Sequence, residues 1–363
     1  MSESQDRVLM RGNHALAEAA IRAGCRFYAG YPITPQNEVP EYMAENMPKA
    51  GGVFIQGESE IASINMVLGA AVTGHRAMTS SSSPGISLKQ EGISFLAGQE
   101  LPAVIVNMMR GGPGLGNIAG SQADYYQATR GGGHGDYRTP VLAPASVQEL
   151  TDLTYQAFDI ADRYRTPVMI LADGMLGQTM EPVILPPALD PKNLPAKDWA
   201  LRGAKGRPGR RSRSLILDTK EMEEHNWKLQ RKYKQIETNE TRFEEFELKD
   251  ARLAVVAFGT AARIAKGALK RVRREGLKVG LFRPITLWPF PDRALRALAA
   301  RGIGNFIVFE LNAGQMVDDV RLALEGKAKV HLYGRPGGAI PTPLDLAKVI
   351  ATRYHHWFGR SGS

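Results

Sequence analysis

The sequence predicts an α/β protein with two parallel sheets, the second smaller than the first. Short apolar runs rich in Val, Ile and Ala alternate with helical patterns from Met10 to about Pro187. The same alternation resumes near Leu253, after a charged stretch. A chain of 363 residues is also too long for one ordinary hydrophobic core. Because strands that alternate with helices form parallel sheets covered on both faces, we expect two α/β domains.

The first domain is expected over residues 1–187. Its clearest strand signals are the apolar runs Ala103–Asn107 and Pro167–Asp173, each short enough for a buried strand. Its helical patterns cover Gly12–Ala23, Ser59–Thr73 and Ser146–Tyr164.

Residues 188–250 are expected to form a charged linker that contains one helix. The composition is proline-rich, then basic, then rich in both charges. Asp218-Thr-Lys-Glu221 has the pattern of a capping box, which predicts a helix through about Ile236. Its apolar stripe is sparse (Met222, Leu229, Tyr233 and Ile236). The helix is therefore expected to pack on another part of the protein and not to form a third core.

Residues 251–363 predict the second, smaller domain. The expected strands are Leu253–Phe258, Val279–Phe282 and Phe306–Glu310. The expected helices between them are Ala261–Glu275 and Ala294–Arg301. This strand–helix–strand order again indicates a parallel sheet.

The composition is that of a globular protein, with 43% hydrophobic and 23% charged residues. The first residues are polar, and no run of about 18 apolar residues indicates a membrane span. We therefore expect a cytoplasmic protein without membrane contact.

The cysteine count limits the redox chemistry that this chain can hold. Cys25 is the one cysteine, so the chain can form neither an internal disulfide nor a thiolate-held iron–sulfur cluster. The seven histidines show no metal-ligand spacing. If the protein transfers electrons, the clusters must lie on another subunit.

The net charge of +9 is concentrated in one basic run, residues 202–213, which has six cations and no acid. Nucleic-acid binding requires basic residues clustered on one face. Three glycines and a proline in this run indicate a loop instead. We interpret it as a solvated linker or a subunit contact, and we expect no nucleic-acid partner.

Three short motifs carry the chemical information. Tyr31-Pro-Ile-Thr-Pro35 follows an apolar segment, Glu60 lies at the start of a predicted helix, and Arg110 follows the strand Ala103–Asn107 and precedes Gly-Gly-Pro. Taken singly, these are a loop, a helix start and a turn.

Taken together, in this order and spacing, they resemble the thiamine-diphosphate pyrimidine domain of the 2-oxoacid:ferredoxin oxidoreductases. Within that family the 2-oxoisovalerate (branched-chain) type is the most similar. The resemblance covers about Gly12–Pro182 and resumes over about Ala251–Leu344. It implies a thiamine-diphosphate pyrimidine-binding fold followed by a transketolase C-terminal-like domain that includes Glu310-Leu-Asn-Ala-Gly-Gln-Met316.

The resemblance also implies a reaction. The family oxidatively decarboxylates a 2-oxoacid with thiamine diphosphate and coenzyme A as co-substrate, giving acyl-CoA, CO2 and reduced ferredoxin. A carboxyl group at the pyrimidine N1′ promotes removal of the thiazolium C2 proton. Glu60 matches the family glutamate, and Glu58 is the competing candidate.

The same comparison assigns substrate contacts to Thr34 and Arg110. Two prolines restrict the backbone beside Thr34, and a guanidinium suits bidentate recognition of a carboxylate. Relatives that take 2-oxoglutarate often have Ser-Thr where this chain has Gly114 and Leu115. We interpret Leu115 as an apolar wall that favours an aliphatic side chain, because a second buried carboxylate needs a partner.

Further cofactor contacts are expected from residues beside these motifs. They are Tyr31, Pro32, Ile33, Ser82 and Ser83. The run Ser80–Gly85 offers hydroxyls and backbone donors near a helix start, for the cofactor or for coenzyme A. His134 and Asp136, in a glycine-rich stretch, receive no assigned role.

The Gly-Asp-Gly…Asn motif that holds the diphosphate through a divalent metal is absent from this chain. We therefore expect no metal ligand here, and a partner subunit that completes the site. The resemblance implies a beta-type subunit with the diphosphate motif, Mg²⁺ and a 4Fe-4S cluster, a gamma-type subunit, a ferredoxin-like subunit, and ferredoxin as acceptor. The expected assembly is a hetero-oligomer.

Three alternatives stay open at this point. The first is the same chemistry on 2-oxoglutarate, pyruvate or an aryl glyoxylate. The second is a non-oxidative thiamine decarboxylase component, which predicts no ferredoxin-linked partner. The third is a non-catalytic scaffold, which is expected to have lost the glutamate and arginine chemistry that this chain keeps.

Overall fold

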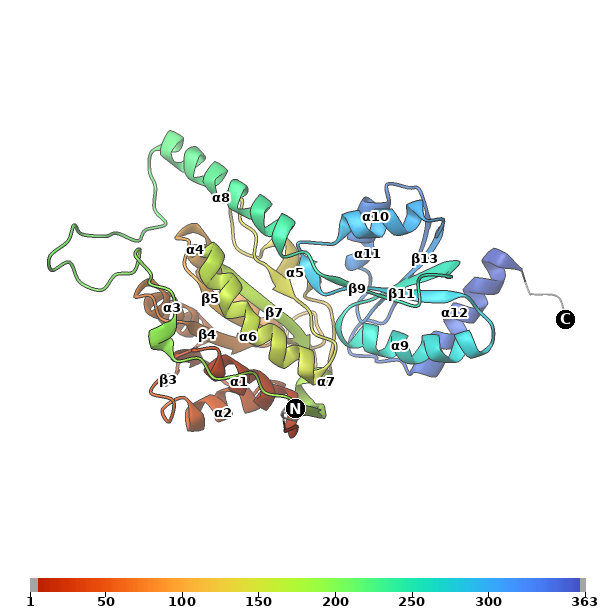
Figure 1. The fold of residues 1–363 in the computed structure, drawn as a ribbon, viewed down its shortest axis with the longest axis horizontal. Coiled ribbons are helices and arrows are strands. Elements are labelled where there is room, and N and C mark those ends of the chain that lie inside the picture. Colours follow the sequence, from red (N-terminus) through yellow and green to blue (C-terminus); the bar gives the residue numbers. More distant parts are fainter. Residues whose placement is uncertain (1–5, 360–363) are drawn as a thin grey trace, which may run out of the picture.

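The computed structural model of the chain describes residues 6–359 and contains two α/β units side by side (Figure 1). A seven-stranded sheet forms the centre of the larger unit, in the order β12-β6-β7-β5-β4-β2-β3. Its neighbours from β6 to β3 are parallel, and β12 is antiparallel to β6. The strands are β2 (Phe27–Gly30), β3 (Val53–Gln56), β4 (Ala77–Ser81), β5 (Ala103–Met109), β6 (Val141–Leu142), β7 (Pro167–Asp173) and β12 (Thr286–Trp288).

Helices cover both faces of this sheet, as expected for a parallel sheet (Figure 1). The helix pair α1 and α6 packs on one face and the pair α3 and α4 on the other. The helices of this unit are α1 (Gly12–Arg22), α2 (Glu38–Asn46), α3 (Glu60–Val72), α4 (Ser83–Gly98), α5 (Tyr125–Arg130), α6 (Val147–Tyr164) and the short α7 (Gly174–Gln178). Strands β1 (Val8–Arg11) and β8 (Met180–Val183) form a separate antiparallel pair.

The smaller unit has a five-stranded sheet in the order β14-β13-β10-β11-β9, parallel except for β9. Helices α9 and α12 pack together on one face, and α10 and α11 on the other (Figure 1). Its strands are β9 (Phe243–Phe246), β10 (Leu253–Val256), β11 (Val279–Pro284), β13 (Asn305–Glu310) and β14 (Lys329–Gly334). Its helices are α9 (Gly259–Arg274), α10 (Asp292–Ala300), α11 (Met316–Leu324) and α12 (Pro343–Phe358).

The segment between the units contains α8 (Thr219–Asn239) and a one-turn helix at Pro191–Asn193. Asp218 caps α8 by accepting a hydrogen bond from the Glu221 amide at 2.8 Å. Leu229, Tyr233 and Ile236 are buried, whereas Met222 is 38% exposed. The helix therefore packs on the larger unit with the last three residues of the predicted stripe, and Met222 is the exception.

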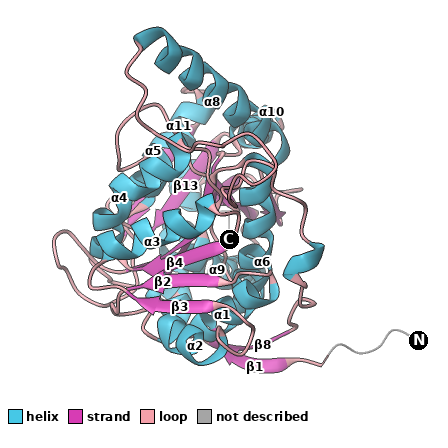
Figure 2. Cartoon of the chain, turned by 90° about the vertical axis from the view of Figure 1, so that its left-hand side faces the viewer, coloured by secondary structure: helices cyan, strands magenta, loops and turns pink. Residues whose placement is uncertain are grey.

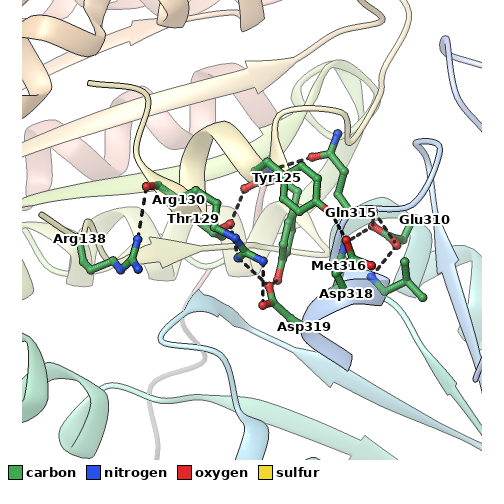
Figure 3. Close-up of polar contacts among 11 residues, drawn as sticks. Tyr125, Thr129, Arg130, Arg138, Glu310, Gln315, Met316, Asp318 and Asp319 are labelled. Atoms are coloured by element: carbon green, nitrogen blue, oxygen red, sulfur yellow. Dashed lines mark hydrogen bonds and ion pairs between the residues drawn. The ribbon is translucent and has the colours of Figure 1, made fainter. Parts of the chain in front are cut away.

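Each unit also receives a strand that the sequence pattern did not predict. Strand β9 comes from the linker and extends the second sheet, and β12, after β11, pairs with β6 of the first sheet. Polar contacts join the units as well (Figure 3). Tyr125 and Arg130 of α5 both bind Asp319 of α11, the arginine through two bonds of 2.9 Å. Among residues 6–359, no helix is long and apolar enough to cross a membrane.

Candidate active site at the carboxyl edge of the first sheet

The candidate site lies where the loops after β2, β4 and β5 meet. These strands are parallel, β4 pairs with both β2 and β5, and Figure 2 shows β4, β2 and β3 side by side. Their carboxyl ends therefore lie at one edge of the sheet, the usual place for a ligand in an open α/β fold. Helices α3 and α4 begin at the same edge, at Glu60 and Ser83.

Glu60 is buried at the first turn of α3, with 6% of its surface exposed. The helix begins there because Ser59 accepts a hydrogen bond from the Ala62 amide at 3.1 Å. The alternative carboxylate, Glu58, is exposed. Only Glu60 of the two is therefore placed inside the site.

Glycines on α4 make room for Glu60. A Cβ atom at Gly85 would lie 2.5 Å from Glu60 Oε1 and 2.1 Å from Ser81 Oγ. A Cβ atom at Gly92, two turns further along, would lie 2.6 Å from Ile64 of α3. The two glycines let α3 approach α4 closely, so the carboxylate of Glu60 rests against the first turns of α4.

Several polar groups at this edge have no hydrogen-bond partner within residues 6–359. They are the Ser81 and Ser82 hydroxyls, the Gln36 amide nitrogen and the Arg110 Nε, and all four are buried. The Gln36 oxygen is already in use, because Ser80 Oγ donates to it at 2.5 Å. Since buried polar groups are usually satisfied, this concentration indicates that a polar molecule binds here.

Arg110 and Thr34, the two residues predicted to contact the substrate, lie next to each other. Arg110 is 6% exposed and donates through Nη1 to the Thr34 carbonyl at 2.9 Å and through Nη2 to the Leu115 carbonyl at 3.0 Å. Within the described residues, the hydroxyl of Thr34 accepts a single long hydrogen bond of 3.4 Å, from Asn37. The guanidinium therefore holds the two loops together, while the Thr34 hydroxyl stays available to a ligand.

Ser83 is committed to the protein itself. Its hydroxyl donates to Asp124 at 2.6 Å and accepts from the Arg110 amide at 3.0 Å. Asn107 donates to the same Asp124 carboxylate at 2.9 Å. Burial raises the pKa of Asp124, which the hydrogen bonds from Ser83 and Asn107 oppose. This network fixes the backbone of Arg110, so Ser83 contributes by positioning the arginine.

The remaining predicted residues lie at the rim. Tyr31 is 38% exposed, Pro32 is exposed, and Ile33 is half-buried. Leu115 is 79% exposed, between Gly114 and Gly116, whose φ angles are +67° and +62°. Residues 6–359 therefore do not enclose the Leu115 side chain, and its role as an apolar wall stays a prediction.

His134 and Asp136 are exposed, and the Asp136 carbonyl accepts a hydrogen bond from Gln230 of α8 at 2.7 Å. Asp173 caps α7 by accepting from the Met175 and Leu176 amides at 3.0 and 3.2 Å. The carboxylate of Asp173 therefore has a structural role, the capping of α7.

The sequence patterns did not indicate Lys89 or Gln36, whereas Ser81 lies in the predicted hydroxyl run Ser80–Gly85. Lys89 is fully buried on α4 and donates to Thr79 Oγ1 at 3.0 Å and to the Glu60 carbonyl at 3.4 Å. Burial lowers the pKa of Lys89 to about 8, and the nearby Glu60 opposes that shift. The available signal was the lone lysine four residues after Gly85, in a stretch of small and apolar residues.

The donor set fits the pyrimidine half of thiamine diphosphate. A buried carboxylate beside unpartnered hydroxyl and amide groups matches a heterocycle that both donates and accepts hydrogen bonds. The other half of that cofactor is a metal-bound diphosphate. Residues 6–359 contain no cluster of three or more His, Cys, Asp or Glu side chains able to hold a metal.

Comparison with known families agrees with this arrangement. The profile described as "Pyruvate flavodoxin/ferredoxin oxidoreductase, thiamine diP-bdg" matches residues 18–247. The profile described as "Pyruvate:ferredoxin oxidoreductase core domain II" matches residues 251–346. The two matches together span both structural units.

Among curated proteins, the ketoisovalerate oxidoreductase subunit VorB of Methanothermobacter marburgensis is 50% identical over 94% of this chain and 96% of its own length. The 2-oxoglutarate synthase subunit KorA of Archaeoglobus fulgidus is 42% identical over 94% of this chain and 98% of its own length. Each similarity therefore covers nearly all of both aligned sequences.

Among solved structures, the 2-oxoglutarate:ferredoxin oxidoreductase from Magnetococcus marinus, with 2-oxoglutarate, coenzyme A and succinyl-CoA bound, superimposes with a TM-score of 0.86 at 28% identity. The match covers 97% of this chain and 66% of that longer one. A split-gene transketolase in an inactive beta4 tetramer shares the fold, with a TM-score of 0.58 at 14% identity.

Proposed function

Because this chain belongs to the pyruvate flavodoxin/ferredoxin oxidoreductase family, we propose that it supplies the pyrimidine-binding half of a thiamine site in a branched-chain 2-oxoacid:ferredoxin oxidoreductase. The observation that carries the proposal is the buried Glu60 carboxylate, which rests against Gly85 beside unpartnered polar groups. The chain is a subunit of a 2-oxoacid oxidoreductase, and the site residues below are our assignments.

Thiamine diphosphate, when bound, would supply a carbon nucleophile for the 2-oxo group, formed when its acidic C2–H loses the proton. Glu60 is assigned to the pyrimidine N1′, where its carboxyl group holds a proton in place. Thr34 is assigned to the carboxylate or 2-oxo group of the substrate, since its hydroxyl has only one weak partner. Tyr31, Pro32, Ile33 and Ser82 are proposed to border the cofactor.

Arg110 is assigned to the 1-carboxylate that every 2-oxoacid carries. Two of its donors already hold the loops, and its Nε is buried without a partner among the described residues. A carboxylate would satisfy that donor and neutralise a buried charge. The arginine therefore both orients the loops and keeps a donor for the substrate.

Partner subunits are proposed to complete the active centre. The single cysteine excludes a thiolate-held cluster in this chain, and residues 6–359 show no metal-binding cluster. We therefore place the diphosphate motif, Mg²⁺ and the 4Fe-4S clusters on beta-type and ferredoxin-like subunits, with a gamma-type subunit in the same complex. Coenzyme A is the acyl acceptor, and ferredoxin is the electron acceptor.

The proposed substrate is 2-oxoisovalerate or a related branched-chain acid. Identity is higher to the VorB relative than to the KorA relative, 50% against 42%. Leu115 is exposed here, so we place it against a partner subunit, where it would discriminate between side chains. An apolar wall without a cation leaves the second carboxylate of 2-oxoglutarate unpaired.

The test is turnover by the co-purified complex on 2-oxoisovalerate, pyruvate and 2-oxoglutarate, with coenzyme A and a ferredoxin or dye acceptor. We expect the highest kcat/KM for 2-oxoisovalerate. A methylene group in an apolar pocket is worth about 1–3 kcal/mol, so preference among aliphatic acids should be loose. In Leu115→Thr, the ratio between aliphatic acids and 2-oxoglutarate should fall. A wild-type preference for 2-oxoglutarate would contradict the substrate assignment and leave the family assignment intact.

A further inference from the structure

Lys89 is a buried cation without an ion-pair partner among residues 6–359. Its ammonium lies 3.0 Å from Thr79 Oγ1 and 3.4 Å from the Glu60 carbonyl, and its surface is 0% exposed. No carboxylate oxygen within residues 6–359 comes within 4.0 Å of it, whereas Lys232, whose side chain is 12% exposed, pairs with Glu100 at 3.2 Å. An isolated buried charge is costly, and such groups are concentrated at functional sites.

The secondary structure directs Lys89 toward Glu60. Thr79 and Ser81 are alternate residues of β4 and lie on the same face of the strand. Gly85 and Lys89 are one turn apart and lie on the same face of α4. The Thr79 hydroxyl accepts a hydrogen bond from the Lys89 ammonium, and Gly85 and Ser81 border the Glu60 carboxylate. Two pairs of residues from separate elements therefore converge on the first turn of α3.

We propose that Lys89 is a positioning residue for Glu60: its buried ammonium, 3.4 Å from the Glu60 carbonyl, holds the first turn of α3 in place. This inference rests on the proposed function only in assigning Glu60 to the pyrimidine. A displaced first turn of α3 would carry the Glu60 carboxyl group away from the pyrimidine N1′.

The other charged side chains near this site form hydrogen bonds with residues other than Lys89. Glu60 is the charged group that acts on the Lys89 ammonium. Asp124 is held by Ser83 and Asn107, and Arg110 by the Thr34 and Leu115 carbonyls. Because the pKa of Lys89 is lowered to about 8, the ammonium is mostly charged at pH 7. Its charge is lost as the pH rises above about 8.

The first test uses the full chain alone and measures thermal unfolding at pH 7. Lys89→Met replaces an uncompensated buried charge with an apolar side chain of similar length. We expect a Tm at least as high as that of the wild type. The matched control is Lys232→Met, which breaks an ion pair with the buried Glu100 and should lower the Tm. If Lys89→Met is destabilised as strongly as the control, Lys89 is an ordinary structural residue and the proposal fails.

The second test measures kcat, KM and exchange of the thiazolium C2 proton in the assembled complex. Lys89→Met should slow that exchange by about 100-fold, the cost of misplacing a catalytic group by about 1 Å, and should leave KM nearly unchanged. Lys89→Arg should restore part of the rate, and Lys232→Met should leave it unchanged. Wild-type exchange in an active Lys89→Met complex overturns this assignment alone. Failure of the wild-type complex to oxidise any 2-oxoacid overturns the proposed function as well.

A second, independent observation concerns residues 201–217, which we name the basic arm. It carries Arg202, Lys205, Arg207, Arg210, Arg211 and Arg213 and no acid. Within residues 6–359, Arg213 is the one of these six in an ion pair, an exposed contact with Glu221. The arm extends away from the body of the larger unit (Figure 1).

The arm is attached far from the catalytic edge. The Leu201 amide donates to the Val72 carbonyl at 2.9 Å, and Ser212 donates to the Gln99 side chain at 2.8 Å. Val72 and Gln99 lie at the carboxyl ends of α3 and α4, opposite the helix starts that form the site. The arm is therefore attached at the end of the larger unit opposite the site, and we assign it no contact with the substrate.

Exposed apolar side chains follow the cations. Leu215 is 68% and Leu217 is 83% exposed, and Trp227 on the neighbouring α8 is 59% exposed. Leucines beside arginines favour a protein surface over a nucleic acid, because protein interfaces bury apolar groups within a polar rim. We infer that the basic arm docks on an acidic face of a partner subunit in the same complex.

The test is co-purification of the complex followed by size-exclusion chromatography at increasing salt. The complex should dissociate at lower salt than the wild type when the arm carries Arg207→Glu, Arg210→Glu and Arg211→Glu together. Leu215→Ser with Leu217→Ser should weaken it at every salt concentration. The control carries Lys270→Glu, Arg271→Glu and Arg274→Glu on the exposed side of α9 and should assemble normally. Normal assembly of the arm variants overturns the inference. Binding of a DNA or RNA probe is measured in parallel, and arm variants that lose probe binding but assemble normally overturn it as well.

Discussion

At the residue scale, the chemistry depends on which carboxylate is buried. Glu58 and Glu60 are two positions apart, yet only Glu60 lies inside the site. The difference arises because Ser59 caps α3 and directs the next residue toward α4. Gly85 then supplies the space that the carboxylate occupies.

We expect Glu60→Gln to keep the fold and assembly but to slow exchange of the thiazolium C2 proton by about 100-fold or more, as for other proton-transfer groups. The amide retains the shape of the side chain and loses the charge. The measurement is C2-proton exchange in the assembled complex, with Glu58→Gln as the matched control. Equal rates in Glu60→Gln and wild type would move the role to another carboxylate.

The site residues show which properties a sequence can predict. Glu60, Thr34 and Arg110 could be proposed from the sequence because their motifs carry a family pattern. Lys89 carries no such pattern, and its contacts depend on how closely α4 approaches α3 and β4. The exposure of Leu115 depends on the path of a loop, which local propensity does not determine.

At the element scale, local signals set boundaries well where a cap was present. Helix α3 begins after Ser59 and α6 after Ser146, and each serine accepts a hydrogen bond from the third residue beyond it. Strand β7 has the predicted bounds, Pro167–Asp173. Strands β9 and β12 were missed because each is short and is defined by its pairing with a distant strand.

The close approach of α3 and α4 can be tested by adding one methyl group. Gly92→Ala would bring a Cβ atom within 2.6 Å of Ile64, so the helices must separate. We expect a net loss of about 1–2 kcal/mol, since overpacking exceeds the gain in helix propensity. The control is Gly69→Ala on α3, where nothing lies within 4 Å, and a gain of about 0.5–1 kcal/mol is expected. Urea unfolding midpoints compare the two; an unchanged Gly92→Ala would contradict the close packing.

At the scale of the whole molecule, buried polar contacts hold the two units together. Arg283 of β11 donates to Glu149 of α6 at 2.5 and 2.7 Å and to Glu244 of β9 at 2.8 Å. Its side chain is 2% exposed, whereas those of Glu149 and Glu244 are 33% and 31% exposed. The arginine therefore connects the first unit to two strands of the second.

Arg283→Met should lower the free energy of unfolding by about 1–3 kcal/mol, less than for a fully buried pair because the carboxylates reach water. The control is Arg271→Met, whose pair with Glu275 is an exposed contact of 3.7 Å on α9. The control should change stability by about 0.5 kcal/mol or less. Comparable losses in both variants would show that Arg283 does not join the units.

The last expectation concerns the chain without its partners: it should be colourless, free of iron and inactive on every 2-oxoacid. Cys25 is its one cysteine, and burial raises the pKa of that thiol to about 12, so it is a poor thiolate ligand. The pyrimidine side of the proposed thiamine site is built into this chain, but a diphosphate would find no metal-binding cluster within residues 6–359. Iron analysis, visible absorbance and turnover, measured before and after adding the partner subunits, test this division of labour. Stoichiometric iron on the purified chain would contradict it, because the cluster would then need ligands that the sequence does not contain.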